Sequence, residues 1–218
     1  MSPASNHLVG EVSLTNPKRS VAGSETTSVA LRLTLCALLT TPSAYRKVQD
    51  EIDAFYAENS GDVISYAQVK TFTYLQAVIR ETMRLWPPSS GLFSKQVPDS
   101  GDTVHGYYLP PGTEIAQSMT GIGRTRELFG ADSDIFRPER WLEASSERAE
   151  EMASTVDLVF STAKYNCLGK HIALMELGKI LVEVCRLPFL GVHNCLLLMF
   201  CGRFSDATTL PRSTTLPP

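Results

Sequence analysis

Two neighbouring stretches near the start of the chain have the spacing of apolar residues that predicts helices. Residues 28–39, SVALRLTLCALL, are apolar nearly all round and are interrupted only by Arg32 and Thr34, a pattern typical of a helix buried on most sides. Thr41 and Pro42 suit the cap and the first position of a second helix. The apolar face of that helix consists of Tyr45, Val48, Ile52 and Phe55, before the stop at Asn59, Ser60 and Gly61.

Two further helices are predicted downstream. One has an apolar stripe made of Phe72, Leu75, Ile79 and Trp86. It ends at Pro87 and Pro88, through which a helix cannot continue, and Glu81 and Arg84 are expected on its opposite side. The last helix is predicted from helical spacing and is ended by Pro188. Its apolar positions are Ala173, Leu177, Ile180, Leu181 and Val184.

Between these two helices the pattern changes to short strands and loops. Gly and Pro become frequent over residues 89–117, and alternating runs at 103–109 and 113–116 predict small strands joined by a Pro-Pro-Gly turn at 110–112. Residues 121–159 read as a polar loop. The expected fold class is therefore mainly α with a small β-sheet.

The two ends of the chain differ from its middle. Residues 1–20 show neither helical nor strand periodicity and predict a loose segment. Residues 21–186 form the patterned region. Residues 187–218 predict a divergent, partly disordered tail. The apolar run at 187–200 contains His193 and Asn194 and is shorter than the roughly 20 apolar residues that span a bilayer. We therefore expect no transmembrane span in this chain, and the first residues do not resemble a secretory signal peptide.

Charge and cysteine usage narrow the class of protein. Lys and Arg number 20 against 23 Asp and Glu, for a net charge of −3, so the chain lacks the broad basic surface that a nucleic-acid partner requires. The five cysteines are odd in number, widely spread and without a C-x-x-C pair. This pattern argues against a disulfide framework and a zinc ribbon, and favours a reducing, intracellular compartment.

Cys167 is the first candidate for chemistry. It lies in FSTAKYNCLGK just before the last predicted helix, where the helix dipole would stabilise a thiolate, and Gly169 allows the backbone to turn closely over whatever the sulfur holds. Such a thiolate serves as a nucleophile, a redox centre or a ligand for a soft metal. On local sequence alone a buried free cysteine is the commoner case. A cysteine hydrolase using His171 is disfavoured, since no third group is available to orient the histidine.

Two other groups of residues carry possible chemistry. Glu81 and Arg84, in ETMR, are spaced to form a helical ion pair, and Arg140, in FRPERW, offers a second guanidinium for the same carboxylate. Glu25 and Thr26, in AGSETTS, follow a flexible Gly23 at the head of the first helix. A carboxylate beside a hydroxyl can pass protons to a bound oxygen species if the helix opens there; the alternative is a plain helix start capped by Ser24.

Taken in this order, AGSETT, ETMR, FRPERW and FSTAKYNCLG resemble the C-terminal half of the cytochrome P450 family, the haem-thiolate monooxygenases, over about residues 21–186. The continuation CLGKHIALMEL resembles fungal members. The resemblance implies haem b as the cofactor and insertion of one oxygen atom from O₂ into a small organic molecule. It also implies an NADPH-cytochrome reductase as the electron donor.

The resemblance assigns a role to each candidate residue. Cys167 would be the proximal ligand of the haem iron, with Phe160 packed beside the thiolate and Gly169 following it. Thr26 would be the distal hydroxyl that hydrogen-bonds iron-bound oxygen, and Glu25 its acidic neighbour in proton delivery. The structural triad would be Glu81, Arg84 and Arg140, and the substrate pocket would include Ala22, Leu92 and Phe93.

The chain also departs from the family pattern. Ser161 and Ala163 stand where glycines are usual, and Tyr165 stands where an arginine usually pairs with a haem propionate, a role that Lys164 would fill in part. The family's membrane anchor, which often places members at the endoplasmic reticulum, and its earlier helices have no counterpart here, so an incomplete P450 fold is expected. The alternative to a monooxygenase is a non-catalytic helical fragment that retains the motifs without binding haem.

Overall fold

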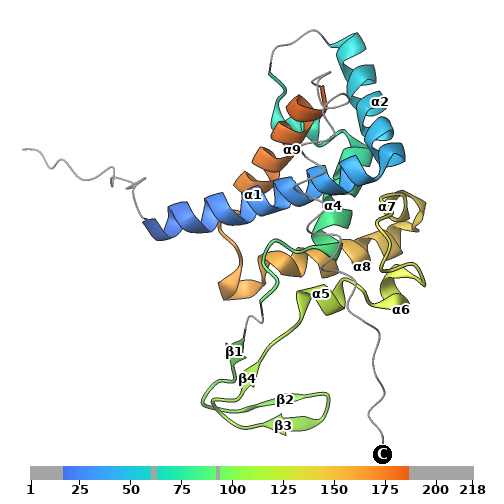
Figure 1. Ribbon diagram of the computed structural model, residues 1–218. Helices are drawn as coiled ribbons and strands as arrows, with labels where there is room; N and C mark the ends of the chain where they lie inside the picture. Colours follow the sequence, from blue (N-terminus) through green and yellow to red (C-terminus); the bar gives the residue numbers. More distant parts are fainter. Residues whose placement is uncertain (1–16, 60–62, 92–93, 187–218) are drawn as a thin grey trace, which may run out of the picture.

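The computed structural model describes residues 17–59, 63–91 and 94–186 (Figure 1). Its first half contains α1 (Pro17–Thr40), α2 (Pro42–Glu58), α3 (Tyr66–Val69) and α4 (Thr73–Leu85). Four short strands follow: β1 (Lys95–Gln96), β2 (Asp102–Val104), β3 (Tyr107–Leu109) and β4 (Glu114–Ile115). The second half contains α5 (Met119–Ile122), α6 (Arg126–Phe129), α7 (Arg140–Glu143), α8 (Ser146–Asp157), the 3₁₀ turns η1 (Leu158–Phe160) and η2 (Ala163–Tyr165), and α9 (Lys170–Arg186). The described part is thus mainly helical with little strand, as the sequence predicted.

Helix α4 forms the centre of the helical body. It contacts α1, α2 and α9 as well as α5, α7 and α8, so neighbours cover it all round. Glu81 and Arg84 are as fully buried as Leu75 and Val78 on the same helix. The sequence placed Glu81 and Arg84 on the side opposite the apolar stripe, and that side is buried as well, because the segment from α5 to α8 covers it.

Helix α1 is longer than the predicted segment and runs across α4 and α9 (Figure 1). It begins at Pro17 rather than near residue 28 and continues without interruption through Gly23, where the sequence suggested a local opening. Ala30, Thr34, Ala37 and Leu38 are buried on it. The Thr34 hydroxyl remains satisfied there because Oγ1 donates to the Ala30 carbonyl at 2.8 Å.

Helix α2 begins and ends where the sequence predicted, with Thr41 at the cap, Pro42 in the first turn and Asn59 at the end. Val48 and Ile52 are fully buried against the core. The carboxylate of Glu51, which points from α2 to the start of α4, accepts hydrogen bonds from the backbone N–H groups of Tyr74 and Leu75, both at 3.0 Å. One helix thereby caps the next.

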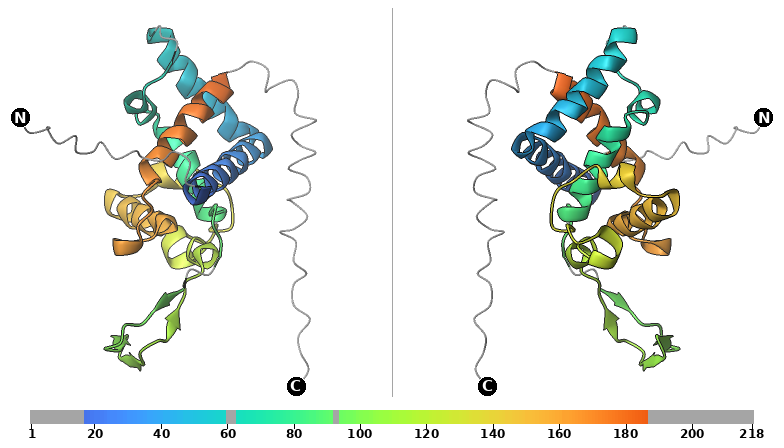
Figure 2. Two further views of the ribbon diagram at one scale, coloured as in Figure 1. Left: turned by 90° about the vertical axis from the view of Figure 1, so that its left-hand side faces the viewer. Right: turned by 90° about the vertical axis from the view of Figure 1, so that its right-hand side faces the viewer.

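The strands form two antiparallel pairs that project from one end of the helical body (Figure 2). Strands β2 and β3 pair from Asp102↔Leu109 to Val104↔Tyr107, and β1 pairs with β4. The run predicted as one strand at 103–109 is therefore a hairpin. It reverses at His105 and Gly106, whose φ values are 49° and 83°, and the Pro-Pro-Gly turn instead links β3 to β4.

The predicted polar loop at 121–159 contains helices, so this prediction was wrong. Helix α8 is the longest of them, with Ser145 Oγ accepting from the Arg148 N–H at 3.3 Å as its cap. Only Met152 and Val156 on α8 are buried, and two apolar positions among many polar ones give a weak periodic signal. The residues that pack α8 against α4 are thus too few to predict it.

Helix α9 is close to the predicted last helix, and its inner face includes Leu177, Leu181 and Cys185. Ile180, predicted on that face, is 40% exposed, and Pro188 lies outside the described residues. Burial raises the pKa of the Cys185 thiol to about 12. Cys36, on α1, is in a disulfide bond, which the cysteine spacing did not predict. Among the described helices, none has the length and apolar character needed to cross a membrane.

Candidate functional site

A cavity of about 840 Å³ lies between α1, the end of α4 and the start of α9. Cavities of about 300–1,000 Å³ with apolar walls are typical binding sites for small molecules and cofactors. From α1 its wall includes Ala22, Gly23, Ser24, Thr26, Thr27 and Ala30. From α4 and the segment after it come Met83, Pro88 and Ser89. The remaining lining residues come from the segment before α9 and from α9 itself: Val159, Phe160, Cys167, Leu168, Gly169, Ile172, Ala173, Leu174, Glu176 and Leu177.

The cavity brings together five of the residues singled out in the sequence. Ala22 and Thr26 lie on α1, and Phe160, Cys167 and Gly169 lie in and after the turns before α9. More than 130 residues separate the two groups in the chain. Their meeting follows from the packing of α1 against α9, and it brings a hydroxyl from one helix and a thiol beside the other to one cavity.

Cys167 presents a free, exposed thiol at this cavity. Its backbone N–H donates to the Phe160 carbonyl at 2.8 Å, and its own carbonyl accepts from the Lys170 N–H at 3.4 Å, at the first residue of α9. A side chain at Gly169 would place a Cβ 3.9 Å from the Cys167 sulfur. Two backbone hydrogen bonds therefore hold Cys167 beside the cavity, whereas Cys185, near the end of α9, is buried.

The loop before Cys167 has an unusual backbone. Ser161 and Ala163 have φ values of 59° and 50°, in the left-handed region that costs an L-residue about 1–2 kcal/mol and that favours glycine. These are the two positions where the sequence resemblance expects glycines. The chain thus keeps the loop shape with residues that fit it less well.

Thr26 and Glu25 differ in their relation to the cavity. Thr26 lines it, and its Oγ1 donates to the Ala22 carbonyl at 2.8 Å, so the hydroxyl oxygen remains able to accept a hydrogen bond from the cavity side. Glu25 is exposed and is not part of the wall. The hydroxyl of Ser28 donates to the Glu25 backbone carbonyl at 2.9 Å. Among the described residues, no hydrogen bond or ion pair orients the Glu25 carboxylate itself.

Lys164 lies beside the cavity rather than in its wall. Its Nζ is 5.0 Å from the ring centroid of Tyr165, and Nζ of Lys95, from β1, is 5.3 Å from the same centroid. Among the described residues, neither ammonium group has a carboxylate within 4.0 Å. Two uncompensated positive charges therefore flank an aromatic ring two residues from Cys167. Leu92 and Phe93 lie outside the described residues.

Behind the cavity, Glu81 holds two arginines, which is the pairing that the sequence predicted. Its carboxylate accepts from Arg84 Nε at 2.9 Å and Nη2 at 2.8 Å, and from Arg140 Nε at 2.9 Å. All three side chains are at most 3% exposed. Because a buried carboxylate is costly unless fully paired, these contacts make the cluster a single unit that fastens α7 to α4.

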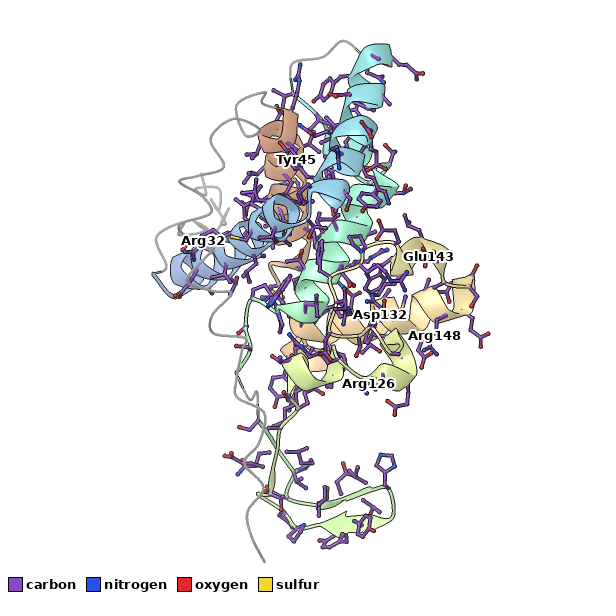
Figure 3. The ribbon with its side chains drawn as sticks, turned by 45° about the vertical axis from the view of Figure 1, so that its right-hand side comes forward. Arg32, Tyr45, Arg126, Asp132, Glu143 and Arg148 are labelled. Atoms are coloured by element: carbon purple, nitrogen blue, oxygen red, sulfur yellow. The ribbon has the colours of Figure 1, made fainter. Side chains whose placement is uncertain are left out.

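The sequence missed other members of this cluster. The Arg137 backbone N–H and the Trp141 indole N–H also donate to Glu81, each at 2.9 Å. Asp132, labelled in Figure 3 beside the α7 segment, accepts from Arg140 at 3.0 Å and Arg137 at 2.7 Å. Burial alone would raise the pKa of Asp132, but these hydrogen bonds outweigh it and lower the pKa. Arg137 and Trp141 both belong to the FRPERW motif. Their presence in this motif was the sequence signal that could have identified them as partners of Glu81.

The chemistry of the wall indicates what the cavity can hold. One thiol faces a cavity with many apolar residues, and the described residues contain no group of three or more His, Cys, Asp or Glu that could hold a metal ion. A metal bound at Cys167 would therefore have to bring most of its ligands with it. Haem fits this donor set, since its macrocycle is apolar, its iron needs one protein thiolate, and the open space at Gly169 leaves the sulfur approachable.

The described part is thus a mainly helical protein with a thiol at an apolar cavity. Comparison with known families makes this specific. Residues 11–186 match the family described as Cytochrome P450, and the chain belongs to this family. The resemblance found in the sequence is thereby confirmed, as is a fold corresponding to part of the P450 fold.

Fungal cytochrome P450 monooxygenases are among the proteins most similar to this chain. It is 45% identical over 170 residues to the cytochrome P450 monooxygenase ABA1 of Pyricularia oryzae, covering 76% of this chain and 33% of that protein. It is 44% identical over 167 residues to the cytochrome P450 monooxygenase abl1 of Leptosphaeria maculans, covering 75% and 29%. The cytochrome P450 monooxygenase ACRTS1 of Alternaria alternata is 38% identical, with 76% and 44% covered. The chain thus spans about a third of the length of the first of these relatives.

Proposed function

We propose that this chain carries the haem-binding part of a monooxygenase that inserts one oxygen atom from O₂ into a small organic molecule. The observation that supports this proposal most strongly is the cavity, which joins the Cys167 thiol to the Thr26 hydroxyl from distant segments. Family membership supports an oxidoreductase of the haem-thiolate type. The names of the relatives, all cytochrome P450 monooxygenases, point to the same reaction class.

The proposed cofactor is haem b, which the Cys167 thiolate would hold through the haem iron. When bound, haem supplies the redox-active iron at which O₂ is activated, and the thiolate donates electron density to that iron. The chain's part is to present the sulfur without a competing partner. The Cys167 N–H to Phe160 carbonyl bond fixes the backbone, and Phe160 lines the same cavity as Cys167.

Thr26 is proposed to orient protons on the α1 side of the cavity. Its hydroxyl is positioned by the Ala22 carbonyl and can accept a hydrogen bond while donating one. Glu25, exposed and free to reach solvent, would resupply protons to this hydroxyl. Helix α1 continues unbroken through Gly23. Gly23 leaves space at the cavity wall, since a Cβ there would meet no atom within 4 Å.

Lys164 is proposed to hold an acidic group of the cofactor, together with Lys95. The two ammonium groups near Tyr165 have no described carboxylate partner, so an anion placed near them would gain a charge-assisted contact. This arrangement would stand in for the arginine that the family usually has at position 165. The remaining cofactor contact is Gly169, whose missing side chain leaves the sulfur accessible.

The substrate is proposed to be a small organic molecule that enters beside Ala22, and Leu92 and Phe93 remain proposed pocket residues. Electrons would come from an NADPH-cytochrome reductase, inside the cell and, as for many family members, at the endoplasmic reticulum. The triad of Glu81, Arg84 and Arg140 would support the haem-binding core from behind. The rival function is a non-catalytic helical protein that keeps these residues without binding haem.

A haem titration of the full chain tests the proposal. Ala22→Trp fills the cavity from α1, whereas Ala57→Trp adds the same bulk to an exposed site on α2. We expect the wild-type chain and Ala57→Trp to take up one haem per chain, and Ala22→Trp to bind at least tenfold more weakly. Failure of the folded wild-type chain to take up haem would refute the proposal and favour the rival function.

A further inference from the structure

The loop that carries Cys167 is closed by an ion pair across its two ends. We define the cysteine loop as residues 158–169, between the last residue of α8 and the first residue of α9. Asp157 ends α8 and Lys170 begins α9, and Lys170 Nζ lies 2.9 Å from Asp157 Oδ2. Figure 1 shows this connection, in orange, leaving α8 and returning to the start of α9. We infer that Asp157 and Lys170 form a latch that positions the Cys167 thiol.

The placement of both charges is unfavourable for the helices that carry them. The C-terminal end of a helix has a partial negative charge and its N-terminal end a partial positive charge. Asp157 sits at the negative end of α8, and Lys170 sits at the positive end of α9. Each charge therefore opposes its own helix, and the pair offsets both penalties only while the loop is closed.

The same lysine also contacts the inside of the loop. Its Nζ lies 5.2 Å from the ring centroid of Phe160, whose carbonyl accepts the Cys167 N–H at 2.8 Å. A continuous series of contacts thus runs from Asp157 through Lys170 and Phe160 to Cys167. The Lys170 side chain is only 24% exposed, so this cation is partly shielded from solvent.

The backbone of the loop explains why it needs such a contact. Ser161 and Ala163, both inside the loop, have the left-handed φ values described above. That strain favours opening, and the backbone bond at Cys167 opposes it. A contact across the ends of a twelve-residue loop stabilises the closed state, which offsets part of the entropy lost when the loop closes. Asp157 and Lys170 are therefore positioning residues for the thiol, and they do not touch the reacting atoms.

Hydrogen exchange on the haem-free chain tests the latch without relying on the proposed function. The amide of Cys167 reports loop closure, and the amide of the fully buried Leu181 on α9 reports global unfolding. We expect Lys170→Met and Asp157→Asn each to speed exchange at Cys167 about threefold, since partly exposed ion pairs are weak, with no change at Leu181. The double variant should be no faster than either single variant, because the pair is already lost.

Controls make the result decisive. Lys179 lies on the same helix as Lys170, and it forms no ion pair with a described residue. Lys179→Met should therefore leave exchange at Cys167 unchanged. At about 1 M salt, where the Debye length falls to about 3 Å, the partly exposed pair is weakened, and exchange at Cys167 in the wild-type chain should shift towards that of Lys170→Met. Additive effects in the double variant, unchanged exchange in both single variants, or an equal effect of Lys179→Met would each overturn the latch.

The role in positioning the thiol has a second readout, which rests on the proposed function. In haem-loaded chain, Lys170→Met and Asp157→Asn should lose the thiolate-type absorption spectrum about threefold faster than wild type and Lys179→Met. Equal rates would overturn the positioning role. If the wild-type chain takes up no haem, the proposed function fails, and the exchange experiment still decides whether the latch exists.

Discussion

At the scale of single residues, the most consequential group is the Glu81 carboxylate. It is fully buried and accepts hydrogen bonds from side chains of Arg84, Arg140 and Trp141 and from the Arg137 backbone. The E-x-x-R spacing suggested an ion pair, and FRPERW suggested the third member. Its additional partners, Arg137 and Trp141, were not predicted, since their contacts with Glu81 depend on how segments far away in the chain cover α4.

Replacing this carboxylate should therefore be far more damaging than removing an exposed ion pair. Glu81→Gln leaves buried guanidinium groups without a counter-charge, and we expect the free energy of unfolding to fall by about 3–5 kcal/mol. Lys47→Ala removes a surface pair in which Lys47 is 51% exposed, and it should cost less than about 1 kcal/mol. Urea denaturation measures both; similar losses would show that the Glu81 cluster is not the structural unit described here.

Relief of backbone strain gives a second prediction at this scale. Ala163 has a φ of 50°, so Ala163→Gly should raise the free energy of unfolding by about 1 kcal/mol, after allowing for the greater freedom of glycine in the unfolded chain. Ala54→Gly, in the exposed interior of α2, should lower it by about 1 kcal/mol. Thermal unfolding of the two variants tests the contrast, and destabilisation by both would mean that residue 163 carries no strain.

At the scale of elements, helices with strong apolar spacing were predictable and those held by few contacts were not. The limits of α2 followed from Thr41, Pro42 and Asn59. Helix α8 was missed because only Met152 and Val156 on it are buried. The cap of α4 was also beyond prediction: its own cap residue, Phe72, makes no side-chain hydrogen bond, and the cap comes from α2.

This cap between elements can be tested directly. Glu51 accepts from two backbone N–H groups and from the Thr73 hydroxyl at the start of α4, so Glu51→Ala should cost about 1–2 kcal/mol of unfolding free energy. Asp50→Ala changes an exposed neighbour on the same helix and should cost less than about 0.5 kcal/mol. Chemical denaturation distinguishes them, and equal effects would argue that the carboxylate does not cap α4.

At the scale of the whole molecule, the candidate site exists because α1 and α9 pack together. The sequence identified Cys167, Thr26 and Phe160 from motifs, but their common cavity is a property of the packed helices. Glu25 and Lys164 came from the same motifs and lie outside the cavity wall. Motifs thus select residues by type and order, whereas tertiary contacts decide which of them face the same space.

The central claim is that Cys167 binds the iron of haem in this cavity. The most direct measurement is the carbon monoxide difference spectrum of the reduced, haem-loaded chain, compared with Cys167→Ala and with Cys185→Ala, which alters a buried thiol. A thiolate-type spectrum in the wild type and Cys185→Ala, lost in Cys167→Ala, is the predicted result. A thiolate-type spectrum that persists in Cys167→Ala would contradict the account.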